Sequence, residues 1–305
     1  MDTSPHKSDF VYINEIKLHY LDWGGNGEAL IFLTGTGCSA HLYDYIAPRF
    51  ADRFHVLALT RRGQGESDYP ESGYDIHTLT KDVLDFMISL NVNKAILAGH
   101  ALAGLELTHF AERYPDRVSR LIYLDAAFDW RDILSIAGKD PSMNIKPPER
   151  KKEYSSIEEY IDYVKQTRPD LAQVWNELWD QSMVFELDKN DHGYFVEKDT
   201  FDIGKALMET TVTYEPAFAS IKIPVLCFYA MSNDPGYPSY LTEEQMLAAL
   251  NYWKTAWLPW RKKNIQKIKA DIPHARIIEI PNGHHYCFMA QEDLVYEEIS
   301  RFLGE

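Results

Sequence analysis

The stretch Gly99-His100-Ala101-Leu102-Ala103-Gly104 decides the fold of this chain. It follows a short apolar run, Ala95 to Ala98, and it opens a segment with helical periodicity, Leu105 to Tyr114. Small residues stand two positions before Ala101 and two and three positions after it, as a strained turn with close backbone neighbours requires. A strand, a sharp turn and a helix with this spacing indicate a nucleophile elbow, which presents its apex residue at the end of a buried strand.

On both sides of this stretch, the chain repeats the alternation of strand and helix. Short apolar runs that predict buried strands are Ala29 to Leu33, Val56 to Thr60, Arg120 to Leu124, Pro224 to Ala230 and Ala275 to Ile280. Segments with helical period are Leu42 to Phe50 and Leu79 to Leu90, and Phe10 to Asn14 with Lys17 to Asp22 predicts an antiparallel hairpin. We therefore predict an α/β fold with a mostly parallel central sheet flanked by helices.

The alternation stops over residues 126–220, which predicts an inserted unit. This segment carries helical stretches rich in charge, such as Ser156 to Thr167 and Asp170 to Met183. Because it separates two strands of one sheet, we predict a core domain of residues 1–125 and 221–305 and a helical cap of residues 126–220. The later stretch Thr242 to Ile268 predicts one long helix, or two helices broken at Pro259.

Composition excludes several classes of protein. The 305 residues include 31 Lys and Arg against 46 Asp and Glu, a net charge of −15, which disfavours a nucleic-acid partner. No apolar run is long enough for a membrane span, and Met1 to Asp9 lacks the order of a secretory signal. The three cysteines are far apart and predict small buried residues in a protein of the reducing cytoplasm. The histidines look scattered, so we expect no metal site: His6, His19, His41, His55, His77, His109, His192 and His274.

Three more motifs stand in order around the elbow, Gly99 to Gly104. They are Leu33 to Gly37, Leu59 to Asp68 and Pro281 to His285. Together with the elbow, they resemble the glycine-rich oxyanion loop, the R-G-x-G-x-S turn and the catalytic histidine loop of the α/β-hydrolase fold family. The resemblance covers nearly the whole chain apart from the cap. It implies hydrolysis of a small-molecule carboxylic ester or lactone through a Ser-His-Asp triad and an acyl-enzyme, with no cofactor.

The apex residue departs from the family pattern, because Ala101 stands where the family has Ser, Cys or Asp. A methyl group cannot attack a carbonyl carbon. Three explanations are open: a serine enzyme inactivated by a serine-to-alanine change, a natural ligand-binding protein on a hydrolase fold, or a histidine that activates water directly. We favour the first and expect serine at this position in the parent enzyme.

The other two members of the implied triad each have two candidates. His284 directly follows a glycine, as the family histidine does, whereas His285 stands at the usual distance from the last helix; we favour His284. For the acid, Asp125 at the end of one strand competes with Asp234 after the next strand, and we favour Asp125.

The resemblance also implies where substrate is held. The backbone N–H groups of Thr36 and Leu102 are the expected oxyanion donors. Substrate contacts are expected from Gly35 and His100 and from the cap residues Trp175 and Trp179, whose rings favour a bulky apolar substrate. We expect a monomer or a homodimer.

Overall fold

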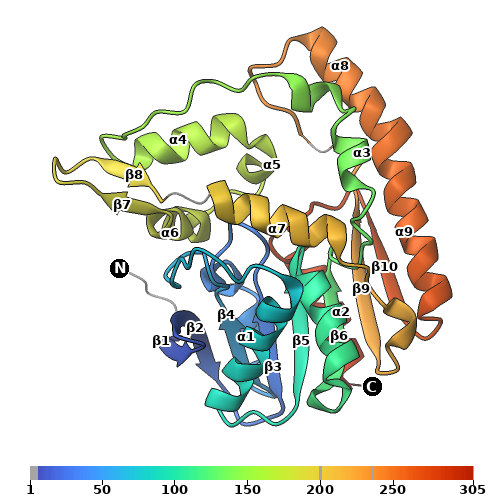
Figure 1. Ribbon diagram of the computed structural model, residues 1–305. Coiled ribbons are helices and arrows are strands. Elements are labelled where there is room, and N and C mark those ends of the chain that lie inside the picture. The colour runs from blue at the N-terminus through green and yellow to red at the C-terminus, as the bar shows by residue number, and fades with distance from the viewer. Residues whose placement is uncertain (1–5, 199–200, 235, 305) are drawn as a thin grey trace.

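The computed structural model describes residues 6–198, 201–234 and 236–304, so Met1 to Pro5 lie outside the described residues. An eight-stranded sheet with the order β1-β2-β4-β3-β5-β6-β9-β10 forms the centre of the molecule (Figure 1). Strand β2 is antiparallel to β1 and β4, and the remaining neighbours are parallel. The strands are β1 Lys7–Ile13, β2 Ile16–Gly24, β3 Ala29–Leu33, β4 His55–Leu59, β5 Ala95–His100, β6 Val118–Leu124, β9 Val225–Met231 and β10 Arg276–Pro281.

The predicted hairpin and the predicted mostly parallel sheet are both confirmed. Asn14 and Glu15 join β1 to β2 with φ values of 50° and 64°, the left-handed backbone that a tight two-residue hairpin turn needs. The inner parallel strands β3, β5 and β9 are buried almost throughout, as expected for strands that helices cover on both faces.

Two hydrophobic cores lie on opposite faces of the sheet, because side chains alternate along each strand. Ala95 and Leu97 of β5 pack into the core under α1 (Ile76–Ser89), α2 (Ala103–Arg113) and α9 (Leu258–Asp271). Ile96 and Ala98 pack into the other core, under the short helices η1 (Ala40–Tyr43), η2 (Ala47–Phe50) and α10 (Cys287–Ala290) and the final helix α11 (Glu292–Gly304). All three cysteines are buried and unpaired, as predicted.

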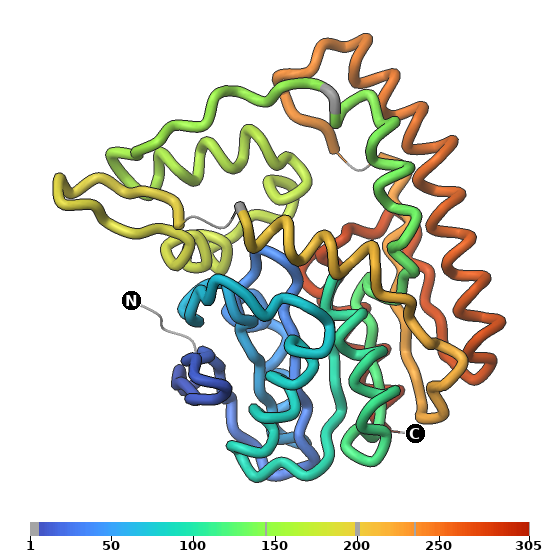
Figure 2. The backbone as a smooth tube through the Cα atoms, viewed as in Figure 1, coloured from blue at the N-terminus to red at the C-terminus, as the bar shows by residue number. Residues whose placement is uncertain are grey.

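The segment 126–220, which we call the cap segment, connects β6 to β9. It holds α3 (Ile133–Ala137), η4 (Pro141–Asn144), α4 (Ile157–Thr167), α5 (Pro169–Ala172), α6 (Glu177–Phe185), β7 (Leu187–Lys189), β8 (Phe195–Glu197), α7 (Phe201–Thr213) and η5 (Phe218–Ser220). Figure 2 shows α4 to β8 as an arm that stands away from the sheet, while α7 crosses above it. The predicted helix Asp170 to Met183 is divided into α5 and α6. Asn176 is the N-cap of α6, where its side chain accepts the backbone N–H of Leu178.

A second segment adds to the cap segment above the sheet. Helix α8 (Glu243–Tyr252) contacts η4 and continues through a π-helical turn, Trp253–Trp257, into α9. Of the two predicted alternatives, the unbroken helix is the one observed: a π-helical turn just before Pro259 accommodates the missing N–H and the ring of the proline. No helix of the described residues is both long and apolar enough to cross a membrane.

Candidate active site

The elbow has the strained geometry that its small residues predict. Ala101 directly follows β5 with φ 51°, and α2 begins two residues later. A side chain on Gly104 would lie 2.0 Å from the carbonyl oxygen of Ala126, so only glycine allows the helix to approach the end of β6 this closely. A non-glycine residue held at positive φ is characteristic of functional turns.

Asp125 ends β6, next to β5 in the sheet, and its side chain is fully buried. One carboxylate oxygen accepts the N–H of Ala230 at 2.9 Å and also pairs with the Arg261 guanidinium of α9. The other oxygen lies 2.7 Å from Nδ1 of His285. Burial by itself would raise the pKa of Asp125, but the charge of Arg261 and the bonds from His285 and Ala230 outweigh it and lower the pKa. Asp125 is therefore held as a carboxylate.

The two neighbouring histidines after β10 point in different directions. His285 bonds Asp125 through Nδ1 and remains partly exposed. His284 instead directs Nε2 to the backbone carbonyl of Asp170 in the cap segment at 2.7 Å, and its Nδ1 accepts the N–H of Tyr286 at 3.0 Å. Our preference for His284 as the partner of the acid is therefore wrong in this geometry, and the alternative, His285, occupies the place. The glycine before His284 therefore does not identify the residue that bonds the acid, because the side chains of the two histidines contact different partners.

The glycine-rich loop, Leu33 to Gly37, lies against the elbow. A Cβ on Gly35 would be 3.3 Å from Cβ of Ala101, which places this backbone next to the apex. Thr36 and Leu102 thus come from the two segments that flank Ala101, Thr36 exposed and Leu102 buried at the start of α2. This arrangement is compatible with the two expected oxyanion donors.

Two residues that the sequence reasoning did not single out hold this loop. Arg61 pairs with Glu106 of α2, both buried, and its Nη1 donates to the carbonyl of Gly35 at 3.4 Å. The Gln64 amide, turned so that its NH₂ faces the loop, donates to the carbonyls of Gly35 and Cys38 at 2.9 and 2.8 Å. Both lie in the motif Leu59 to Asp68, so the polar and charged residues of that motif were the signal that could have identified them.

His100, expected to contact substrate, is 1% exposed and packs under the histidine loop instead. Its Nε2 lies 3.1 Å from the carbonyl oxygen of His285, which fixes Nε2 as the protonated nitrogen. Its Nδ1 is buried and has no partner among the described residues. Burial, reinforced by His285, lowers the pKa of His100 well below its usual value, so the ring is neutral. His100 thus positions the backbone of His285.

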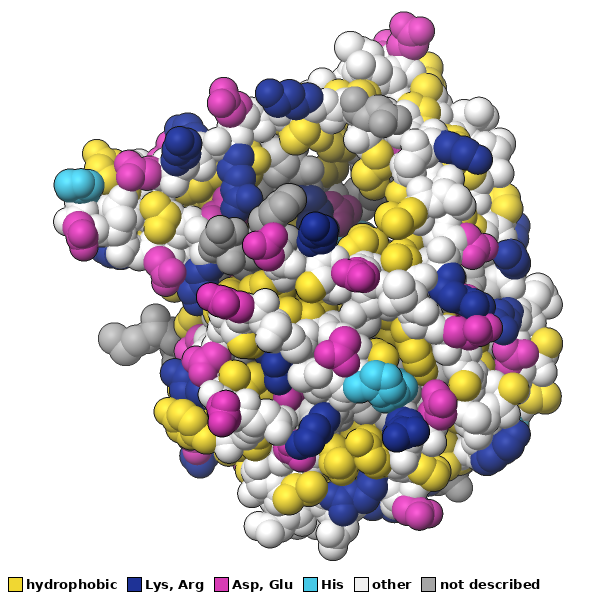
Figure 3. All heavy atoms as spheres, viewed as in Figure 1, with side chains coloured by type: hydrophobic (Ala, Val, Ile, Leu, Met, Phe, Trp, Pro, Cys, Tyr) yellow, Lys and Arg dark blue, Asp and Glu magenta, His cyan; other side chains and the backbone are white. Residues whose placement is uncertain are grey.

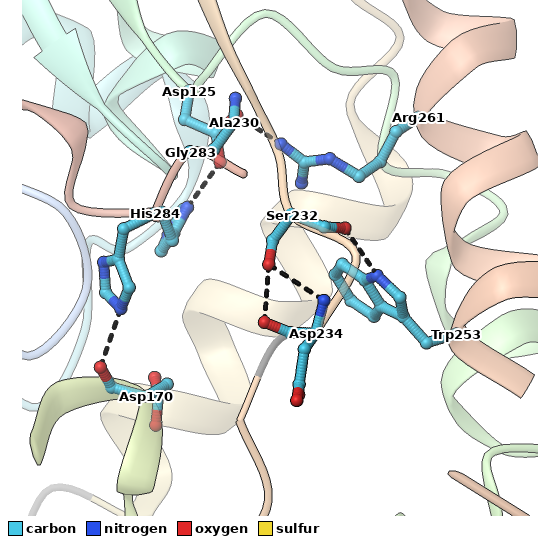
Figure 4. A pocket seen from close by; sticks show the side chains of 10 residues that line it. Asp125, Asp170, Ala230, Ser232, Asp234, Trp253, Arg261, Gly283 and His284 are labelled. Atoms are coloured by element: carbon cyan, nitrogen blue, oxygen red, sulfur yellow. Dashed lines mark hydrogen bonds and ion pairs between the residues drawn. The ribbon is translucent and has the colours of Figure 1, made fainter. Parts of the chain in front are cut away.

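A cavity of about 220 Å³ opens beside the Asp125–His285 pair (Figure 4). Its wall includes Asp125, His285, Arg261 and Trp253. Asp234, the alternative acid, also lines it, but this exposed residue makes local bonds: Oδ1 accepts the N–H of Gly236 at 2.9 Å. Asp125, and not Asp234, is therefore the carboxylate that bonds the His285 imidazole.

A larger cavity of about 480 Å³ shares Asp170 and Trp253 with the first. Its lining is aromatic, with Tyr237, Tyr240 and Trp257 facing Arg168 of the cap segment. Figure 3 shows the molecule hollowed between the cap segment and the α8 side. The expected contacts of Trp175 and Trp179 are not at this cavity. Trp179 is fully buried and stacks on Trp175, and Trp175 borders a separate groove beside His284.

The expectation of scattered histidines is wrong in another region. His6, His19 and His41 converge with Asp44 and Glu66 beside strand β2, although 35 residues separate the first from the last histidine. These residues meet only in the folded chain, and their spacing in the sequence does not predict the cluster.

Comparisons with known proteins agree with this architecture. Residues 28–146 match the family described as alpha/beta hydrolase fold. A crystal structure of E-2-(acetamidomethylene)succinate hydrolase superposes with a TM-score of 0.74 over 98% of this chain and 100% of that chain, at 20% identity. The chain has the α/β-hydrolase fold.

Two curated relatives each match between 33% and 38% of this chain. Epoxide hydrolase 1 of Caenorhabditis elegans is 32% identical over 118 residues, which are 38% of this chain and 29% of that protein. The 2-(acetamidomethylene)succinate hydrolase of Mesorhizobium japonicum is 32% identical over 101 residues, 33% of this chain and 36% of that protein. These matches therefore cover well under half of either relative, and the two relatives bear the names of different hydrolytic activities.

Proposed function

We propose that this chain carries the active site of a hydrolase for carboxylic esters or lactones, with the nucleophile position occupied by Ala101. The observation that supports the proposal is the buried Asp125 carboxylate bonded to His285 at 2.7 Å, beside an elbow that keeps positive φ at its apex. A strained apex and a buried acid–imidazole pair are costly features that ordinary packing does not require. The two relatives named as hydrolases support a hydrolase in general, and the ester or lactone class is our inference from the site.

Each residue has a definite role in the parent enzyme with serine at position 101. His285 takes the serine proton through Nε2, while Asp125 holds the imidazole by its Nδ1–H and stabilises the imidazolium. The serine oxygen attacks the acyl carbon, and the N–H groups of Thr36 and Leu102 stabilise the oxyanion, each by about 3 to 4 kcal/mol. His285 then protonates the departing alcohol oxygen, and water activated by the same ring releases the acid.

The substrate is bulky and partly apolar. Its larger part fits the 480 Å³ cavity between Tyr237, Tyr240, Trp253 and Trp257. Aromatic walls of this kind bury apolar surface, while the few polar groups set orientation. The Arg168 guanidinium on this wall is paired with Asp170 at 2.9 Å, so its charge is largely offset.

In the present chain, the same groups bind substrate and turn it over very slowly. Ala101 supplies no nucleophile, so only oxyanion stabilisation and binding remain, about 10³- to 10⁴-fold over water. Ala101 is also the observation that favours a second function, a ligand receptor on a hydrolase fold. The cytoplasmic location remains a prediction from the sequence.

The test is to compare this chain with Ala101→Ser and Ala101→Asp on aryl esters, lactones and epoxides. We expect Ala101→Ser to show a burst and steady ester or lactone turnover, about 10⁶-fold above Ala101. Ala101→Asp is the matched control, because a carboxylate at the elbow suits epoxide opening instead. Ester-binding without turnover in both variants would overturn the proposal in favour of the receptor.

A further inference from the structure

A second group of histidines and carboxylates lies away from the candidate active site. His19 comes from β2, His41 from η1, and Glu66 from the turn after β4. Oε2 of Glu66 is 3.1 Å from Nε2 of His19 and 3.3 Å from Nε2 of His41. The three donor atoms all lie within 4.8 Å of one another.

These separations match the edges of a metal coordination sphere. Zinc bonds His nitrogen and carboxylate oxygen at about 2.0 to 2.2 Å, so neighbouring ligand atoms of a tetrahedral site are about 3.3 to 3.5 Å apart. Two imidazoles and one carboxylate with an open fourth position are a donor set that Zn²⁺ and related divalent ions accept.

The far nitrogens of both imidazoles are also held, as in established metal sites. Nδ1 of His41 lies 3.4 Å from Asp44, and Nδ1 of His19 lies 2.9 Å from the Thr60 hydroxyl. Asp44 in turn accepts the indole N–H of Trp23 at 3.2 Å and contacts His6 at 2.6 Å. Nε2 of both rings therefore faces Oε2 of Glu66, and Nε2 of His19 also lies 3.1 Å from the Ser8 hydroxyl.

Burial and charge support a cation at that point. His19 and His41 are buried, and the Glu66 side chain is 26% exposed, which leaves a route from solvent. Charged and titratable groups around it are Asp44, Glu66, His6 and the Lys198 side chain, which donates to the neighbouring Gly65 carbonyl at 3.0 Å. A divalent ion with neutral imidazoles would balance the two carboxylates.

We propose that His19, His41 and Glu66 bind a divalent transition-metal ion of the Zn²⁺ type, with water in the fourth position. Asp44 orients His41 and does not bind the ion. The site is independent of the proposed hydrolase function, because none of its residues lines the cavities beside Asp125 and His285.

The proposed site lies where the core contacts the cap segment. It links β2, η1 and the turn after β4, and the His41 ring stacks on Phe185 of α6 with centroids 5.1 Å apart. The Ser39 and Ser182 hydroxyls, 3.1 Å apart, connect the same two elements. A bound ion would therefore fix the base of the arm that the cap segment forms.

The competing occupant of this position is a proton. Burial alone would lower the pKa of His41, but the bonds to Asp44 and Glu66 raise it to about 9. A purely protonated network would need no metal, so the experiment must separate the two.

The test is titration of the chelator-treated full chain, free of any histidine tag, with Co²⁺ at pH 7.5. We expect one equivalent to bind with the visible absorption of tetrahedral Co²⁺, Zn²⁺ to displace it, and the melting temperature to rise reversibly. Glu66→Gln and His41→Gln should each weaken binding at least 10-fold. Asp22→Asn is the control, because Asp22 pairs with His55 at 3.0 Å outside the cluster and should bind normally.

If His41→Gln does not fold, Glu66→Gln alone tests the proposed metal site, because glutamine is nearly isosteric with glutamate and the Glu66 side chain is partly exposed. Absence of binding by the unaltered chain would overturn the proposal and leave a protonated network. Binding that Glu66→Gln leaves unchanged, in a variant with a native circular dichroism spectrum, would overturn it as well.

Discussion

Two regions of this molecule pair imidazole with carboxylate, and they differ in what their nitrogens do. At the carboxyl ends of β5, β6 and β10, His285 uses Nδ1 to bond Asp125 and stays partly exposed next to a cavity. Beside strand β2, both ring nitrogens of His19 and of His41 contact a hydroxyl or a carboxylate oxygen. The first arrangement leaves a nitrogen for moving a proton, whereas the second holds its rings fixed around one point.

The carboxylates differ in a complementary way. Asp125 is fully buried and shared between His285, a backbone N–H and Arg261. Glu66 is partly exposed and lies between two imidazoles. A buried carboxylate with a permanent cation remains charged while its histidine changes protonation, which suits acid–base chemistry. A carboxylate among imidazoles suits the binding of a cation.

The largest expected effect comes from removing His285, the residue that we propose takes and returns the serine proton. In the Ala101→Ser background, His285→Ala should lower kcat about 10⁵- to 10⁶-fold, because the serine then has no base. His284→Ala should lower it less than 10-fold, because His284 bonds the Asp170 carbonyl at 2.7 Å. Steady-state kinetics of both variants measure this. Equal losses at the two positions would break the distinction drawn between the neighbours.

A smaller effect tests the permanent cation beside Asp125. Arg261→Met should lower the free energy of unfolding by about 3 to 5 kcal/mol, because it leaves a buried carboxylate with one cation fewer. Lys263→Met on the same helix is the matched control: its pair with Asp132 is exposed and should contribute less than about 1 kcal/mol. Urea denaturation of both variants gives the comparison, and similar small losses would mean that Arg261 does not sustain the Asp125 charge.

The smallest expected effect concerns His109, a buried histidine whose ring bonds a hydroxyl group and not a carboxylate. His109 bonds the Thr80 hydroxyl at 2.9 Å, and burial lowers its pKa to about 4. Its stabilising contribution is thus complete above pH 6.5 and is lost as pH falls from 6.5 towards 4, about 1 to 3 kcal/mol. His109→Gln should flatten this acidic decline in unfolding free energy measured across pH 4 to 7. An unchanged slope would show that burial alone does not distinguish the histidines.

Much of the fold could be predicted because it depends on local patterns. Apolar runs and helical periods marked each strand of the sheet, and the small residues of the elbow marked its turn. The sequence left open whether Pro259 breaks a helix, and a π-helical turn before it keeps the helix continuous. The predicted helix Asp170 to Met183 is interrupted, because Asn176 starts a new helix. Such adjustments depend on local geometry finer than periodicity.

Residue patterns alone therefore predicted the order of strands and helices and the elbow around Ala101, and they reduced the acid to two candidates, Asp125 and Asp234. The tertiary structure selected Asp125 and His285 from the two candidates for each role, because their side chains meet at 2.7 Å only in the packed fold. It also decided the Arg261 contact and the meeting of His19, His41 and Glu66. Those contacts join segments far apart in the chain, and only the packed sheet with its flanking helices fixes their distances.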